Sequence, residues 1–208
     1  TFSTWVKFND LSAQIIMGSN APTISPALWV TSNDLHFTLY NGNFYSGGGS
    51  YVMELVTTLE ITDTSQWMHI VAKYDSTVST PSSSSIALYI DGVQVTSFTT
   101  ETYPSQNQVA GWNSANEMLI GTAYNSNLTT QNLRAYMAET VNIDGLALGP
   151  DSFGQTDTTT NRWIPKDVSG LTFGTNGFYL NYANSSDVGN DVSGNNNDWT
   201  NVNTVTQV

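Results

Sequence analysis

Two neighbouring segments with strand periodicity, residues 67–75 and 86–95, constrain the fold of this chain more than any other feature. Apolar side chains occupy every second position of both segments, which is the period of an extended strand with one buried face. The pair Asp91-Gly92 in the second segment supplies the positive φ angles that a tight primed turn requires, so the chain folds back there. We therefore expect antiparallel strands whose apolar faces line the core between two sheets: Met68, Ile70, Leu88 and Ile90.

Turn signals recur along the rest of the sequence at intervals of about ten residues. Asn41-Gly42 is the strongest hairpin signal, and residues 76–85 form a polar Ser/Thr-rich loop. Short strands at this spacing are typical of all-β sandwiches, and 208 residues suit one domain of this kind. The sequence therefore predicts a single β-sandwich domain over residues 1–208, with no helix beyond one turn at residues 133–139.

Composition argues against two classes of partner. The chain has 17 acidic and 5 basic residues, a formal charge of −12, so it would repel the phosphate backbone of a nucleic acid. Its longest apolar run, residues 86–90, is far shorter than the ~20 residues of a membrane span, and membrane insertion is not expected. Charged residues make up 11 % of the chain, so its surface is built from neutral polar side chains, as in extracellular and virion-surface β-proteins.

Several motifs resemble a known family. The pattern W-x-H-I-V-x-x-Y-D in residues 67–75, followed by L-Y-I-D-G-V in residues 88–93, resembles laminin-G-like domains of the concanavalin A-like type. Residues 2–7 resemble the opening core strand of that family, and residues 118–121 resemble its I-G strand. The resemblance implies an all-β fold, a two-sheet antiparallel jelly-roll sandwich.

A narrower resemblance lies downstream. Four segments are similar to a run found in structural proteins of tailed bacteriophages, especially marine ones: residues 136–154, 163–166, 177–182 and 191–199. This similarity implies a non-enzymatic virion structural protein, such as a fibre, spike, tail or head appendage, at the virion surface. Its expected partners are other copies of itself or other virion proteins, together with a host-surface glycan. The alternative is a carbohydrate-binding or adhesion domain of a cellular surface protein.

A glucanase is the third reading, because sandwiches of this family include glycoside hydrolases. Such enzymes need two carboxylates about 5 to 10 Å apart, often from a Glu-x-Asp-x-x-Glu or Glu-x-Asp-x-Glu strand. The sequence lacks that strand, and its nearest approach is Glu139 and Asp144, on opposite faces of an extended chain. We therefore expect no catalytic residues. His69 is expected to make a structural hydrogen bond beside Trp67 rather than to act as a base.

Loop aromatics are the candidates for carbohydrate binding, because sugars stack on Trp and Tyr rings while neighbouring amides bind their hydroxyls. Two such pairs fall in expected loops: Trp112 with Asn113, and Tyr124 with Asn125. The alternative is that these rings fill small local cores or subunit contacts.

An oxygen-rich segment near the C-terminus is the candidate metal site. Residues 187–198 combine three carboxylates, several amide oxygens and two glycines, the kind of ligand supply that Ca²⁺ requires. The expected calcium ligands are Asp187, Asn190, Asp191, Asn195, Asn197 and Asp198. The alternative is a network of turns in which these side chains bind their own backbone. No other cofactor is expected.

Both ends of the sequence point to assembly. A strand pattern already covers residues 2–8, so the numbered chain is expected to begin inside a longer gene product. Residues 177–208 are expected to supply a strand or turn segment that covers the sandwich edge, and residues 202–208 form a β-prone tail. Because open strand edges pair readily with other chains, we expect a symmetric assembly rather than a free monomer.

Overall fold

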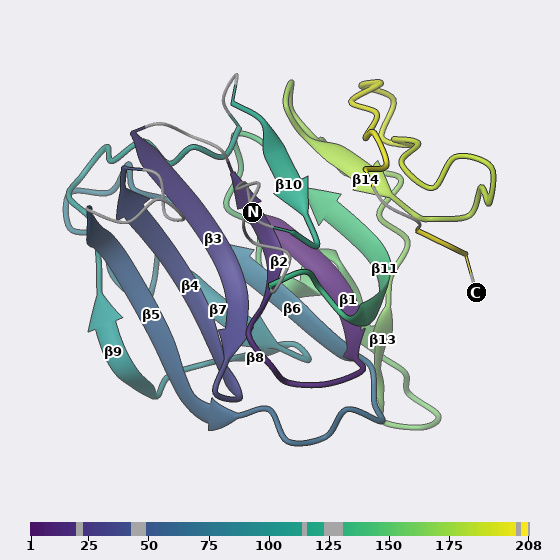
Figure 1. Ribbon diagram of the computed structural model, residues 1–208, viewed down its shortest axis with the longest axis horizontal. Coiled ribbons are helices and arrows are strands. Elements are labelled where there is room, and N and C mark those ends of the chain that lie inside the picture. Colours follow the sequence, from purple (N-terminus) through teal and green to yellow (C-terminus); the bar gives the residue numbers. More distant parts are fainter. Residues whose placement is uncertain (20–22, 43–48, 114–115, 123–130, 203–204, 208) are drawn as a thin grey trace.

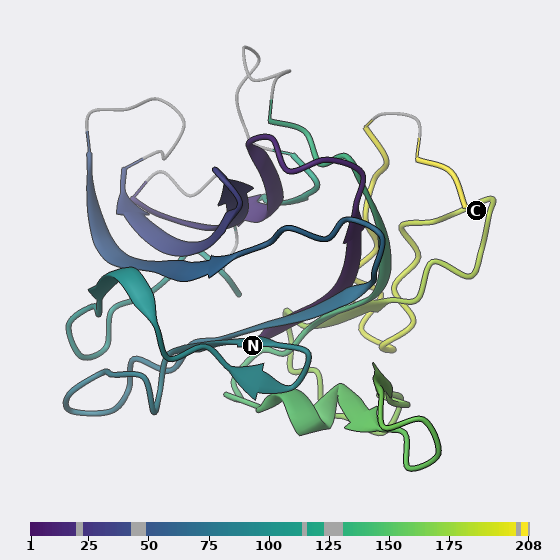
Figure 2. The same cartoon turned by 90° about the horizontal axis from the view of Figure 1, so that it is seen from below.

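The computed structural model describes residues 1–19, 23–42, 49–113, 116–122, 131–202 and 205–207. Two six-stranded antiparallel sheets, here called sheet A and sheet B, form its two layers (Figures 1 and 2). Sheet A consists, in spatial order, of β14 (Phe178–Leu180), β11 (Ala135–Asn142), β1 (Phe2–Phe8), β6 (Met68–Lys73), β7 (Ala87–Ile90) and β8 (Val93–Gln94). Sheet B consists of β10 (Met118–Ile120), β2 (Gln14–Ser19), β3 (Ile24–Thr31), β4 (Asp34–Asn41), β5 (Ser50–Glu60) and β9 (Phe98–Thr102). This is the two-sheet antiparallel jelly-roll sandwich that the sequence predicts.

The core between the sheets is built from alternate residues of the long strands. Ile70 of β6 and Leu88 of β7 are fully buried in one cluster with Phe37 of sheet B. Met68 and Ile90 are partly buried and pack against the same cluster. The predicted core positions are confirmed, because strand periodicity decides which face of each segment leaves water.

The turn between β7 and β8 has the geometry that its sequence predicts. Ile90 pairs with Val93 across a two-residue loop, in which Asp91 and Gly92 have φ angles of +48° and +81°. These angles belong to a primed turn, whose twist matches that of the flanking strands. The Asp91 carboxylate also accepts the main-chain N–H of His69 at 2.8 Å, which ties the turn to β6.

Sheet A is covered on its outer face as well. After β11 the chain forms the 3-10 turn η1 (Pro150–Ser152) and the hairpin of β12 (Gly154–Thr156) and β13 (Trp163–Pro165), which lie on the side of sheet A away from sheet B (Figure 2, green). A second apolar cluster joins this region to sheet A: Val71, Val141, Ile143, Phe153, Val168 and Phe173. Strand β14 then pairs with β11 and forms one edge of sheet A.

Residues 133–139 do not form the helical turn that the sequence allows. They lead into β11, because Tyr136 and Met137 pair with Lys7 and Val6 of β1. Within the described ranges the one helical element is η1. None of the helical structure in those ranges is long and apolar enough to cross a membrane.

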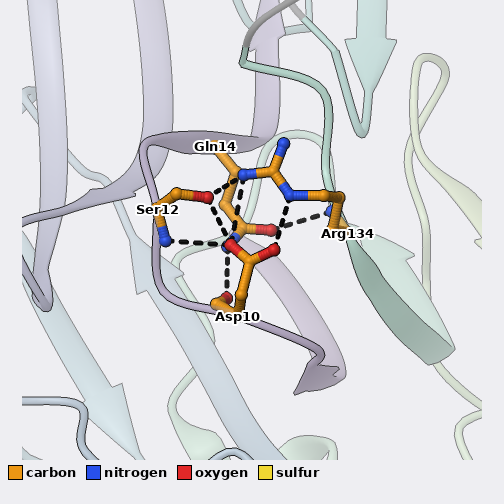
Figure 3. Close-up of polar contacts among 4 residues, drawn as sticks. All are labelled: Asp10, Ser12, Gln14 and Arg134. Atoms are coloured by element: carbon orange, nitrogen blue, oxygen red, sulfur yellow. Dashed lines mark hydrogen bonds and ion pairs between the residues drawn. The ribbon is translucent and has the colours of Figure 1, made fainter.

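An ion-pair cluster fixes the connection between the two sheets (Figure 3). Arg134 donates from Nε to Asp10 Oδ2 at 2.7 Å and from Nη2 to Ser12. Gln14 of β2 donates to the Asp10 main-chain oxygen at 2.6 Å and accepts the Arg134 main-chain N–H at 2.8 Å. Hydrogen bonds from Ser12, followed by those from Arg134, lower the pKa of Asp10 to about 2. Because both charged side chains are partly exposed, the cluster sets loop geometry more than it stabilises the fold.

Candidate functional site

Sheet B has an outer face that is turned away from sheet A (Figure 2). This face carries aromatic and polar side chains in three rows. The rows follow from strand register, because directly paired residues point to the same face. In the first row Trp29 of β3 pairs with His36 of β4, which pairs with Val56 of β5. The Trp29 and His36 rings pack with their centroids 4.2 Å apart. Burial lowers the pKa of His36, so this ring is neutral at pH 7.

The third row contains Ser25, Tyr40 and Tyr51. The two tyrosine rings meet edge to face at a centroid distance of 5.3 Å, and Tyr40 Oη accepts the main-chain N–H of Gly49 at 2.9 Å. Tyr40 is therefore held in place, whereas Tyr51 is 42 % exposed. Among the described residues, Tyr51 is the most exposed ring on this face.

The middle row holds Ala27, Thr38, Glu54 and Thr102. Ala27 and Thr38 are fully buried, Glu54 is partly buried, and Thr102 at the sheet edge is exposed. Burial raises the pKa of Glu54, and burial together with the nearby Glu54 charge raises the pKa of Tyr51. The accessible part of the face thus presents an aromatic ring, a carboxylate and a hydroxyl side by side. Such a set can stack on a sugar ring and hydrogen-bond its hydroxyls.

Sequence reasoning missed this site. The alternation within residues 35–40 places His36 and Tyr40 on one face, which was the usable signal. The pairing of Tyr51 with Tyr40 depends on a register shift in β5, which leaves Val52 without a partner between Tyr51 and Met53. A bulge of this kind cannot be read from local periodicity.

The predicted loop aromatics do not form a sugar platform. Trp112 is 8 % exposed, and its ring stacks on Phe37 with centroids 5.0 Å apart. The ring of Tyr74 also meets it edge-on, so Trp112 packs in the core, as in the alternative of a local core. Asn113 is partly buried and accepts a hydrogen bond from Asn142 Nδ2 at 2.6 Å. Tyr124 and Asn125 lie outside the described residues.

Four of the six predicted calcium ligands form side-chain hydrogen bonds with main-chain groups: Asp191, Asn195, Asn197 and Asp198. Asp191 accepts main-chain N–H groups from Tyr179 at 2.8 Å, Ser193 at 2.9 Å and Asn197 at 2.9 Å. Burial alone would raise the pKa of Asp191, but these hydrogen bonds outweigh it and the net pKa is lowered. Asp198 Oδ1 accepts the Asp191 main-chain N–H at 2.9 Å. The carboxylate oxygens therefore already face N–H donors.

The amides of this segment act in the same way. Asn195 and Asn197 donate from Nδ2 to the Gly177 main-chain oxygen at 2.9 and 2.8 Å. Asp187 and Asn190 lie in consecutive turns, where the Asn190 main-chain N–H donates to the Asp187 main-chain oxygen at 3.2 Å. Across the described part of the chain, no three His, Cys, Asp or Glu side chains gather closely enough to hold a metal ion. The turn network is the arrangement found, and calcium binding by this segment stays a prediction.

His69 makes the structural hydrogen bonds expected of it, but with a different tryptophan. Its ring stacks on Trp5 at 4.8 Å, Nδ1 accepts the Trp163 indole N–H at 2.9 Å, and Nε2 lies 2.8 Å from Ser3 Oγ. Because Nδ1 accepts, the ring proton lies on Nε2 and points at Ser3. His69 therefore cannot take a proton from Ser3, and this buried Ser–His pair is not a nucleophile with its base. Trp67 is exposed.

Comparison with known proteins identifies the family of this chain through one family model. No curated protein matches the chain. Among solved structures, the native heptameric SAP-like pentraxin from Limulus polyphemus is similar, with 14 % sequence identity, a TM-score of 0.43, and a match that covers 67 % of this chain and 60 % of the pentraxin. The chain thus spans less than two thirds of that protein. The laminin-G-type model of the concanavalin A-like lectin/glucanases superfamily matches residues 1–151, so the chain belongs to this superfamily.

Proposed function

We propose that this protein is a non-enzymatic glycan-binding module, and that it binds through the outer face of sheet B. The observation that carries this function is the exposed Tyr51 ring, with the partly buried Glu54 and the exposed Thr102 in the neighbouring row. The Tyr51 ring offers a stacking surface, and the Glu54 carboxylate accepts hydrogen bonds from sugar hydroxyls. The Thr102 hydroxyl already accepts the Glu54 main-chain N–H at 2.9 Å and has a second lone pair for a sugar hydroxyl.

The charge of the protein narrows the glycan class. The chain carries a net charge of −12, and Glu54 adds a carboxylate directly at the face. A sulfated or uronic-acid sugar would be repelled there, because like charges disfavour each other at short range. Neutral hexose-type glycans therefore fit this face best.

A glycan array tests the proposal with a matched control. Tyr51→Ala and Glu54→Gln should each weaken binding to neutral glycans by about tenfold, the equivalent of roughly 1.4 kcal/mol. Tyr136→Ala is the control, because Tyr136 is 41 % exposed, almost the same as Tyr51, but lies on sheet A. Equal loss in Tyr51→Ala and Tyr136→Ala, or no binding of any glycan by the wild type, would reject the face of sheet B as the site.

A glucanase is the second candidate function, because Asp34 lies directly opposite Glu60 on the strands of this sheet. Side chains so paired have Cβ atoms roughly 5 Å apart, within the separation that glycoside hydrolysis uses. Glu60 is exposed, however, whereas a general acid of this class requires a carboxyl sheltered from water. Release of reducing sugar from β-glucans by the wild type, and its loss in Glu60→Gln, would replace the binding function by hydrolysis.

The setting proposed for this module is the surface of a virion, as part of a fibre, spike, tail or head appendage. What supports this setting is the resemblance of residues 136–154, 163–166, 177–182 and 191–199 to structural proteins of tailed bacteriophages. Repeated copies on a particle would turn weak binding by single modules into strong attachment. Immunogold labelling of purified particles tests this setting. Its absence from particles, with the protein on a cell surface instead, would favour the alternative of a cellular adhesion domain.

A further inference from the structure

The hairpin of β12 and β13 rests on sheet A through one aromatic ring. Trp163 of β13 lies against Gly92 in the β7–β8 turn and against Gly154 at the start of β12. A Cβ atom added to Gly92 would lie 2.9 Å from the Trp163 ring, and one added to Gly154 would lie 2.5 Å from it. The indole therefore packs directly against the main chain at two glycines, where any other residue would place a Cβ atom against the ring.

A single hydrogen bond joins this hairpin to the sheets. Of the hydrogen bonds made by described residues, the one between residues 154–165 and the two sheets runs from Trp163 Nε1 to His69 Nδ1, at 2.9 Å. His69 is fully buried between this indole, the stacked ring of Trp5 and the Ser3 hydroxyl. The bond requires a neutral imidazole, because a protonated Nδ1 carries a hydrogen and can no longer accept.

We propose that the contact between His69 and Trp163 is an acid-sensitive latch, which holds residues 154–165 on sheet A at neutral pH and releases them when His69 is protonated. Protonation places an N–H at Nδ1 directly against the indole N–H, so two donors face each other and the hydrogen bond is lost. Phe153 and Val168, on either side of the released segment, stay in the second apolar cluster and anchor its ends. Release uncovers Gly92 and one edge of the buried His69 ring. This latch is independent of glycan binding by sheet B.

No charged side chain near His69 has a hydrogen bond to its ring among the described contacts, so protonation of the ring itself controls the proposed release. On the elements packed against it, Asp91 accepts the His69 main-chain N–H at 2.8 Å. The other charged side chains on these elements are Lys7 on β1, Lys73 on β6, and Asp157, Arg162 and Lys166 in or beside the hairpin. Partial burial raises the pKa of Asp91, partly offset by the His69 hydrogen bond, so Asp91 can also titrate in acid. An Asp91→Asn variant separates the two groups.

The direction of the pH effect follows from burial. Burial lowers the pKa of His69 to about 4 in the closed state, and release of Trp163 lets water reach one edge of the ring, which moves the pKa up toward its ordinary value of 6.5. The open state therefore binds the proton more tightly, and acid favours opening. A full return of the pKa to 6.5 would increase the opening equilibrium by about 80-fold between pH 6.5 and pH 4, which is the upper limit of the effect.

Hydrogen exchange read by mass spectrometry, corrected for the intrinsic rate at each pH, tests the latch on the full chain. In the wild type and in Asp91→Asn, amides of residues 154–166 should lose at least tenfold protection between pH 6.5 and 4.5, while those of β3 and β4 keep theirs. His69→Gln keeps a neutral acceptor, so its hairpin should stay protected in acid. His36→Gln, which removes the other histidine, should behave like the wild type.

Three results would overturn the latch. The first is that the hairpin of the wild type keeps its protection in acid. The second is that His69→Gln loses as much protection as the wild type. The third is that the hairpin loses protection only together with the unfolding of β3 and β4. If His69→Gln does not fold, Trp163→Phe decides, because it lacks the indole N–H. Its hairpin should already be unprotected at pH 7 and show no further change in acid; a wild-type pH response in Trp163→Phe would reject the latch.

Discussion

Each sheet carries a tryptophan directly opposite a histidine on its outer face, and the two pairs have different surroundings. On sheet A, Trp5 is paired with His69, and their rings stack at 4.8 Å. On sheet B, Trp29 is paired with His36, and their rings lie 4.2 Å apart. His69 is fully buried and both of its ring nitrogens have partners, whereas His36 is half-buried and its Nδ1 has none among the described residues.

The difference comes from the chain that lies outside the sheets. Residues 143–173 place a second apolar cluster on sheet A, and Trp163 from the same region completes the hydrogen bonds of His69. The pair of tryptophan and histidine therefore has a structural role on sheet A. On sheet B it leaves a partly exposed aromatic face beside Tyr51 and Glu54, which is where a ligand can bind.

The largest effect expected from this comparison is the loss of the second cluster. Phe153 is 3 % exposed in it, so Phe153→Ala should lower the free energy of unfolding by about 3 to 5 kcal/mol. Tyr51→Ala on the open face of sheet B should cost under about 1 kcal/mol. Urea denaturation followed by far-ultraviolet circular dichroism measures both. A similar loss of unfolding free energy in the two variants would mean that the second apolar cluster does not stabilise the fold in the way that a buried core does.

A second effect, of up to about 3 kcal/mol in the free energy of unfolding, is the different pH dependence of stability that the two histidines produce. Burial lowers the pKa of His69 in the folded protein to about 4, below its ordinary value of 6.5, so the contribution of this residue to stability is complete above pH 6.5 and is lost as the pH falls to about 4. The carboxyl of Asp10, with a pKa lowered to about 2, loses its contribution only in stronger acid. Unfolding free energies at pH 7 and pH 4.5 should differ less in His69→Gln than in His36→Gln. The reverse order would contradict the burial argument.

Much of the sandwich could be predicted because it depends on local pattern. Alternation placed Ile70 and Leu88 in the core, and Asp91-Gly92 fixed its turn, since each depends on neighbouring residues alone. The cover of sheet A could not be predicted, because Phe153 and Val168 lie in irregular chain that has no period to read. The packing of Trp112 in the core could not be predicted either, for a related reason.

Trp112 belongs to a loop that folds back onto the sandwich. There Tyr74 Oη donates to the Gln108 main-chain oxygen at 2.6 Å, and the Trp112 ring turns into the core. Sequence shows that such a residue is in a loop, but not which way the loop folds. The candidate site on sheet B was hidden in the same way, because Tyr51 reaches Tyr40 only through a bulge in β5.

A third effect, of about 1 to 2 kcal/mol in the free energy of unfolding, tests how closely Trp163 packs against Gly92. Gly92 and Gly145 share a φ of +81°, so alanine is strained equally by the backbone at both positions. A Cβ at Gly92 would lie 2.9 Å from the Trp163 ring, whereas one at Gly145 has no atom within 4 Å. Gly92→Ala should therefore destabilise the protein by about 1 to 2 kcal/mol more than Gly145→Ala. Equal melting temperatures of the two variants would show that the indole moves aside freely.

The smallest expected effect concerns calcium. We expect that calcium stabilises neither the C-terminal region nor the two sheets. The Asp191 oxygens accept main-chain N–H groups of Tyr179, Ser193 and Asn197, so a cation could bind only by displacing hydrogen bonds that hold this segment to β14. The melting temperature should therefore be the same in millimolar calcium and in chelator. Asp191→Ala should lower it equally in both solutions, because burial of three N–H groups without an acceptor destabilises the fold with or without the ion. A rise in melting temperature with calcium that disappears in Asp191→Ala would instead show that the segment rearranges to bind calcium, and that the turn network is only its metal-free form.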